Sequence, residues 1–117
     1  MTTIFEKVKT ALDTLSPAVP FAMDVYQTQG GGDLPDVYLA YSLIDSVPVQ
    51  HADNVEVGRS DEIQVSIYKR GGLLSLPDVD TAMRAQGFTK GPARMLPFNS
   101  ESGHFGLATD YYYLHDL

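Results

Sequence analysis

The sequence contains no cysteine and no tryptophan, and basic residues are scarce. The lack of cysteine excludes a disulfide scaffold, a thiolate zinc site, an iron–sulfur cluster and a cysteine nucleophile, and it fits a reducing compartment. Lys and Arg number 8 against 15 Asp and Glu, which gives a net charge of -7. A domain with this charge is repelled by nucleic acid and by anionic membranes unless its few basic residues cluster tightly.

Long hydrophobic runs are also missing. No stretch approaches the ~20 apolar residues that a membrane span requires. The first ten residues carry charges and lack the apolar centre of a signal peptide. We therefore expect a soluble cytoplasmic protein. The length of 117 residues and the hydrophobic fraction of 44% are typical of one globular domain, here 1–117.

Two segments show the periodicity of helices. In the first, one face carries Ile4, Phe5, Val8, Ala11, Leu12 and Leu15. Thr3 has the position of a capping residue, and Pro17 ends this helix because the residue before a proline avoids the helical region. The spacing predicts a second helix over 75–86, with Asp78 near its start and Gly87 as its stop signal.

Strands are predicted over 21–27, 37–44, 62–68, 88–98 and 103–114, from apolar alternation and turn residues. Short consecutive strands favour antiparallel pairing. Two amphipathic helices would then cover one face of the sheet. The expected fold class is α+β: a mainly antiparallel sheet with two helices packed on one face, in the order α-β-β-β-α-β-β. Its predicted core joins the first helix to Val37, Leu39, Ile63, Val65 and Ile67.

The segment 46–60 has the pattern of a hairpin arm. Its β-forming residues are Val47, Val49, Val55 and Val57. They form two short strands on either side of Ala52-Asp53-Asn54, a turn of small polar residues. Pro48 indicates an edge strand, since proline cannot donate to a ladder. One interpretation is a surface loop without a partner. The other is an arm that reaches a neighbouring subunit.

No motif indicates catalysis. The three histidines are His51, His104 and His115, and none has a metal-ligand spacing, so each is expected at the surface or rim. No G-x-S-x-G sequence occurs. Asp78 and Asp80 are two apart on a helix and do not share a face. We expect no enzyme activity, no metal and no cofactor.

The run of tyrosines 111–113 must point its rings to both faces of a strand. One face belongs to the core. The other turns Tyr112 outward beside Asp110, where a large apolar ring with a polar tip suits an interface. Shielding of Tyr112 within the fold is the alternative interpretation.

Several short sequence signatures follow one another along the chain in a characteristic order. A strand at 37–44 (VYLAYSLI) leads into the proline-bearing polar segment, and a strand at 61–68 (DEIQVSIY) follows. Next come a helix containing Ala82-Met83 that ends at Gly87-Phe88, and a strand rich in tyrosine. From about Leu34 to its end the chain resembles the tail completion or tail terminator proteins of long-tailed bacteriophages and prophages.

The resemblance implies a structural role without enzyme activity. Such proteins cap the growing tail tube as a ring, commonly a hexamer, and form the joint to the head connector. The implied partners are further copies of the chain, the tail tube protein and the head–tail connector protein, with DNA only as passing cargo. The implied location is the virion, at the interface of head and tail. Two alternatives stay open: a small cytoplasmic ligand-binding or adaptor module with a ferredoxin-like arrangement, and a small hydrolase or nuclease.

Overall fold

The computed structural model describes residues 3–15, 18–24, 34–52 and 55–116; within 47–58 and 115–116 the description covers the backbone only. The elements are α1 (Ile4–Asp13), β1 (Phe21–Met23), β2 (Val37–Ala52), β3 (Val55–Arg70), α2 (Val79–Ala85), β4 (Thr89–Asn99) and β5 (His104–Asp116). This order confirms the predicted α+β class.

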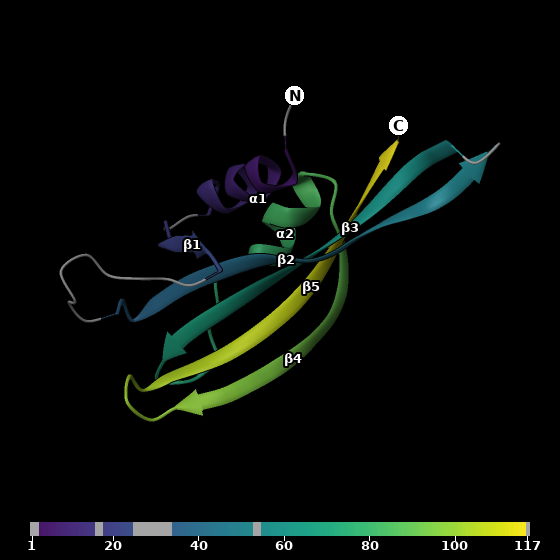
Figure 1. Ribbon diagram of the computed structural model, residues 1–117. Coiled ribbons are helices and arrows are strands. Elements are labelled where there is room, and N and C mark those ends of the chain that lie inside the picture. Colours follow the sequence, from purple (N-terminus) through teal and green to yellow (C-terminus); the bar gives the residue numbers. More distant parts are fainter. Residues whose placement is uncertain (1–2, 16–17, 25–33, 53–54, 117) are drawn as a thin grey trace.

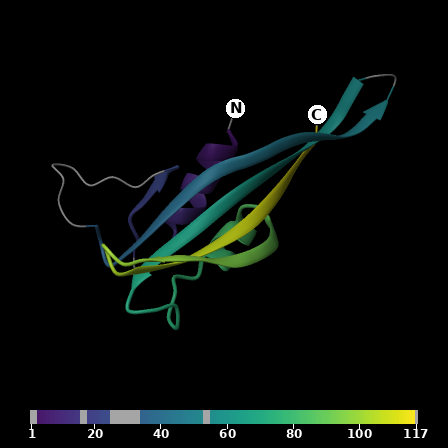
Figure 2. The ribbon, with the colours of Figure 1, turned by 60° about the horizontal axis from the view of Figure 1, so that its bottom comes forward.

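The five strands form one sheet in the order β1-β2-β3-β5-β4, and both helices lie on the same face of it (Figures 1 and 2). Three of the four strand pairs are antiparallel, whereas β1 runs parallel to β2. The sheet is therefore mainly antiparallel, as predicted, and only the β1–β2 pair departs from antiparallel pairing. The connection over 24–36 is long enough to carry the chain back to the start of β2, which a short hairpin turn could not do.

Local signals set the ends of both helices. The Thr3 hydroxyl oxygen accepts a hydrogen bond from the amide of Glu6 at 3.2 Å, which is the predicted cap of α1. The second helix starts later than the predicted residue 75, because Asp78 caps it by accepting from the amide of Thr81. Gly87 ends it with a φ of 92°.

The first strand is shorter than predicted. β1 ends at Met23, and the next residue, Asp24, has a φ of 62°, which turns the chain out of the strand. The predicted continuation over 25–27 lies outside the described residues.

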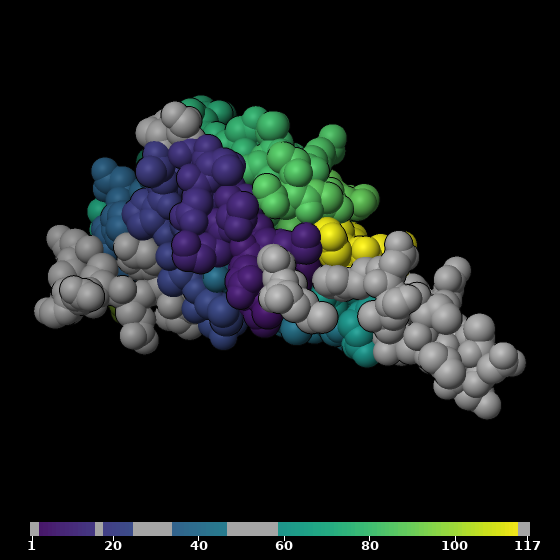
Figure 3. Space-filling model, turned by 90° about the horizontal axis from the view of Figure 1, so that it is seen from above, coloured from purple at the N-terminus to yellow at the C-terminus, as the bar shows by residue number. Residues whose placement is uncertain are grey.

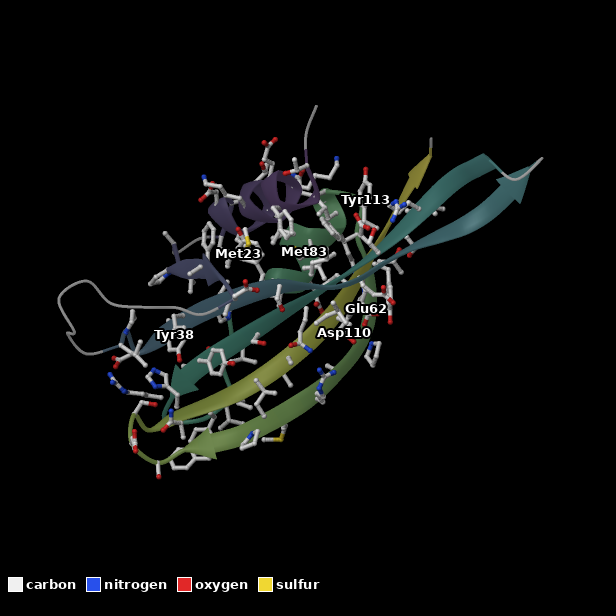
Figure 4. The ribbon with its side chains drawn as sticks, in the orientation of Figure 1. Met23, Tyr38, Glu62, Met83, Asp110 and Tyr113 are labelled. Atoms are coloured by element: carbon white, nitrogen blue, oxygen red, sulfur yellow. The ribbon has the colours of Figure 1, made fainter. Side chains whose placement is uncertain are left out.

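The predicted core is confirmed. Val8, Leu12, Leu39, Ile63, Val65 and Ile67 are buried, and Phe5, Leu15 and Val37 pack against them. Met83 of α2 joins this cluster from the helix side, where Figure 4 also places Tyr113. Figure 3 shows α1 and α2 side by side above the sheet.

The face of the sheet away from the helices carries small, aromatic and polar side chains. Tyr38 stacks on Tyr68 with ring centroids 4.9 Å apart. His104 meets the edge of Tyr38 at 5.0 Å, and its Nε2–H donates to the carbonyl of Pro35. The expectation of a surface position for His104 was wrong, since only 1% of it is exposed. The side chains of His51 and His115 lie outside the described residues.

Candidate assembly site at the projecting hairpin

The central hairpin extends beyond the rest of the sheet. β2 and β3 have 16 residues each and pair from Val37 opposite Lys69 to Ala52 opposite Val55. On one side, β1 accompanies β2 only as far as Tyr41. On the other side, β5 accompanies β3 only as far as Gly58. The molecule is therefore elongated, 53 × 27 × 26 Å, with a two-stranded ribbon at one end (Figures 1 and 2).

The predicted arm over 46–60 lies within this hairpin. The expectation of two separate short strands was wrong, because both continue directly into the central strands of the sheet. Among the described residues no further strand pairs with β2 at Pro48, so Pro48 is on an edge there, as its sequence position indicated. The turn at 53–54 lies outside the described residues, as do the side chains of Val47, Val49, Val55 and Val57. Their contact with a partner stays a prediction.

Four polar residues form a cluster on β2 and β3 just before the two-stranded ribbon, where only β5 still accompanies the hairpin; we call Asp45, Ser46, Arg59 and Asp61 the base cluster. The Ser46 hydroxyl donates to Asp61 Oδ1 at 2.5 Å and accepts from Arg59 Nη1 at 2.9 Å. The amide of Ser46 donates to Asp45 Oδ1 at 2.8 Å. Asp61 is 6% exposed, so its carboxylate needs these partners. The cluster links the two strands through side-chain hydrogen bonds.

Sequence reasoning did not identify the base cluster. Ser46 and Asp61 are opposite each other only because a one-residue register shift separates Leu43 from Asp45 in the pairing with β3. Such a shift is a β-bulge, which bends a strand and redirects its side chains. The polar residues on either side of the arm could have indicated a cluster, but the sequence does not show which of them face each other.

A carboxylate pair lies beside the base cluster, on the face away from the helices. Figure 4 shows Glu62 of β3 and Asp110 of β5 together on that side of the sheet. Gln64 Nε2 donates to Asp110 Oδ1 at 3.4 Å, and Arg94 Nη1 lies 3.8 Å from Asp110 Oδ2. Burial, then the hydrogen bond and negative charge of Asp110, raise the pKa of Glu62.

Tyr112 lies on the same face, opposite Glu62 in the strand register. It is half-buried, and its ring lies over Gly91 of β4: a Cβ at Gly91 would come within 2.4 Å of Tyr112 Cε2. Burial, followed by the charges of Glu62 and Asp110, raises the pKa of Tyr112. The predicted position beside Asp110 is therefore observed with partial shielding by β4, while a role in an interface stays a prediction.

Glu62→Gln is expected to raise the melting temperature at pH 7. The pKa of Glu62 in the folded protein lies above its ordinary value of 4.5, so ionised Glu62 opposes folding. The free energy of unfolding should fall as the pH rises from 4.5 to the raised pKa of Glu62 in the folded protein. The Glu62→Gln variant should not show this decrease. Thermal unfolding followed by circular dichroism at pH 5 and pH 7 measures the effect. Glu101→Gln removes the same charge from an exposed turn and serves as control. Equal pH dependence in parent and Glu62→Gln would contradict the prediction.

An apolar groove lies at the end of the β2–β3 pair opposite the ribbon. Its volume is about 700 Å³, and its apolar lining includes Leu15, Val19, Val37, Leu76, Pro77 and Ala82. Within the described ranges, no three His, Asp or Glu side chains come together in a way that could hold a metal ion. The helices of the described chain are too short or too polar to cross a membrane.

Comparison with known proteins adds no constraint to this geometry. The chain matches no protein-family model and no curated protein sequence.

Proposed function

We propose that this protein is a structural virion component of the tail terminator or tail completion class. In this role it forms a ring, a hexamer in the form that the resemblance implies, which caps the tail tube, binds the head connector and lets DNA pass. The observation that carries the proposal is the two-stranded ribbon that projects from the sheet.

The low stability expected of an isolated two-stranded ribbon favours its binding to a partner. A two-stranded ribbon alone is at best marginally stable in water, and a third strand or a packing partner is usually needed. Beyond Gly58 of β3 the described chain supplies no third strand. The sequence nevertheless places Val55 and Val57 there, and Val47 and Val49 come just before this stretch on β2. Burial of each would contribute roughly 1.5 kcal/mol or more, which offsets much of the entropy lost on ordering and association.

The shape and charge of the molecule are consistent with this role. The ribbon is at one end of the β2–β3 pair, so contact with a different surface of the next copy is head-to-tail, and head-to-tail contacts that close produce rings. The net charge of -7 disfavours tight binding of DNA, which suits a conduit through which DNA slides.

Deletion of residues 48–57, with a short turn joining the ends, tests the proposal. We expect a folded protein that no longer forms rings or joins purified tails. Circular dichroism reports folding, and mass photometry and electron microscopy report assembly. Loss is expected because the deletion removes the ribbon but retains the base cluster and core.

A second variant distinguishes the contribution of the ribbon's length to assembly from the contribution of its apolar side chains. V47T/V49T/V55T/V57T keeps the strand length and β-forming side chains but replaces a methyl group with a hydroxyl at each position. We expect this variant to lose assembly as well. Unchanged assembly of both variants on tails would overturn the proposed role of the ribbon.

A ligand-binding module is the second candidate, and the apolar groove favours it. Its volume of about 700 Å³ falls within the range of small-molecule sites. The ferredoxin-like arrangement attached to that alternative is wrong, since the observed order α-β-β-β-α-β-β differs from β-α-β-β-α-β. The 48–57 deletion also separates the candidates: it leaves the distant groove intact and would not affect such a module.

A further inference from the structure

The outer edge of β2 raises the question of how the protein avoids uncontrolled strand pairing. Beyond Tyr41 no strand lies beside β2 in the described part of the chain, while β2 continues to Ala52. An exposed strand edge with unpaired amide and carbonyl groups is a template for another chain. A ribbon that projects into solvent makes that edge accessible to a second copy.

The pairing pattern shows which residues of β2 turn their backbone outward. The Leu39 amide donates to the Pro20 carbonyl, and the Tyr41 carbonyl accepts from the amide of Asp24. Odd-numbered residues of this part of β2 therefore direct their backbone groups away from β3, since direction alternates along an antiparallel pair. The one-residue bulge between Leu43 and Asp45 reverses this alternation. After the bulge, the outward positions are 46 and 48.

Neither of these two positions offers a free donor. The Ser46 amide already donates to Asp45 Oδ1 at 2.8 Å. Its carbonyl lies 3.4 Å from Arg59 Nη1, which donates to it. Pro48 has no amide hydrogen at all. The bulge thus brings a side-chain-capped residue and a proline to the two outward positions that directly follow it.

The opposite edge of the sheet has a related arrangement. β4 contains Pro92 and Pro97, and its pairing with β5 is interrupted between Lys90 and Ala93 and again between Leu96 and Asn99. Each proline falls inside one of these interruptions. Prolines and bulges are the features with which sheet proteins protect exposed edges. Both edges of this sheet therefore carry the same kind of protection.

We infer that Asp45, Arg59 and Pro48 close the β2 edge to strand addition by a second copy of this chain. A second copy that approaches β2 at this point therefore meets it through side chains and not through a shared ladder of backbone hydrogen bonds. The inference is independent of the proposed function, because a monomer with any role needs the same protection.

Asp45→Ala/Pro48→Val opens the edge, since it removes the cap of the Ser46 amide and supplies an amide hydrogen at position 48. We expect the double variant to self-associate at a concentration about tenfold or more below that of the parent, because new backbone hydrogen bonds form between chains. Sedimentation velocity measures association, and infrared spectroscopy detects intermolecular β-structure. A folded double variant that associates no more than the parent would overturn the inference.

Asp45→Asn is the matched control. It loses the same charge as Asp45→Ala but keeps a side-chain oxygen that accepts from the Ser46 amide. We expect it to behave as the parent. Association of Asp45→Asn as strong as that of Asp45→Ala would show that charge repulsion protects the edge, which overturns the assigned hydrogen-bond cap.

Hydrogen exchange provides a test that needs neither association nor a folded double variant. In the parent, the Ser46 amide should exchange slowly, and Asp45→Ala should accelerate its exchange at dilutions where the protein is monomeric. The Leu39 amide, bonded to Pro20, should stay protected in both and reports an intact sheet. Fast exchange of Ser46 in the parent would overturn the inference. A failure to form rings leaves these exchange rates unchanged.

Discussion

Val65→Asp is expected to abolish folding of the domain. Val65 is 1% exposed and lies in the middle of β3, within the cluster formed by both helices and the sheet. Burial of a carboxylate without a partner costs several kcal/mol, which is comparable with the whole stability of a small domain. Circular dichroism and urea titration should show a protein that is unfolded at pH 7 or retains only a small fraction of the native state.

Met95→Asp is the matched control for this prediction. Met95 is in β4 of the same sheet and is 69% exposed, so a carboxylate there remains in water. Its effect on the free energy of unfolding should be within about 0.5 kcal/mol. A soluble, natively folded Val65→Asp protein would show that the assignment of this face of β3 to the core is wrong.

The order of elements could be predicted because each helix and strand has its own local pattern of apolar residues in the sequence. The spacing of Val8 and Leu12 is helical, and the alternation of Ile63, Val65 and Ile67 is that of a strand with one buried face. Each pattern depends on neighbours within a few residues. The structure confirms the helix face and the strand face that these patterns predict.

The site could not be predicted to the same extent, because it depends on register. Nothing in the sequence shows that Ser46 faces Asp61, or that Glu62 and Asp110 share one side of the sheet. A single bulge decides the first pairing, and a shift of one residue would reverse every side chain. The burial of His104 is also a long-range result, since its partner Pro35 is far away in the sequence.

Tyr111→Phe is expected to destabilise the protein by about 1–3 kcal/mol, because it removes a hydrogen bond to a half-buried, charged acceptor. Tyr111 is 1% exposed, and its hydroxyl donates to Asp80 Oδ1. Asp80 lies in the first turn of α2 and forms an ion pair with Lys90 of β4 at 2.7 Å. These contacts join α2 to two strands. Urea unfolding at pH 7 measures the loss.

The effect of Tyr111→Phe should depend on pH in a defined direction. Burial by itself would raise the pKa of Asp80, but hydrogen bonds from Lys90 and Tyr111 outweigh it and hold the pKa below 3.8. A carboxyl whose pKa is lower in the folded state stabilises the protein above its ordinary pKa and loses that contribution as the pH falls through the folded value. The variant should begin this loss at a higher pH than the parent. Once the pH lies below the pKa of Asp80 in both folded proteins, both have lost this contribution and the ionic part of the difference between them disappears.

A double-mutant cycle isolates the bond between these two residues. Tyr111→Phe, Asp80→Asn and the combined variant should show non-additive losses, since either single change removes the same charged hydrogen bond. Tyr112→Phe is the control: it removes a hydroxyl from the adjacent half-buried ring on the opposite face and should change stability little. Additive losses in the cycle, or an effect of Tyr111→Phe that is the same at every pH, would show that Tyr111 supports α2 through packing alone.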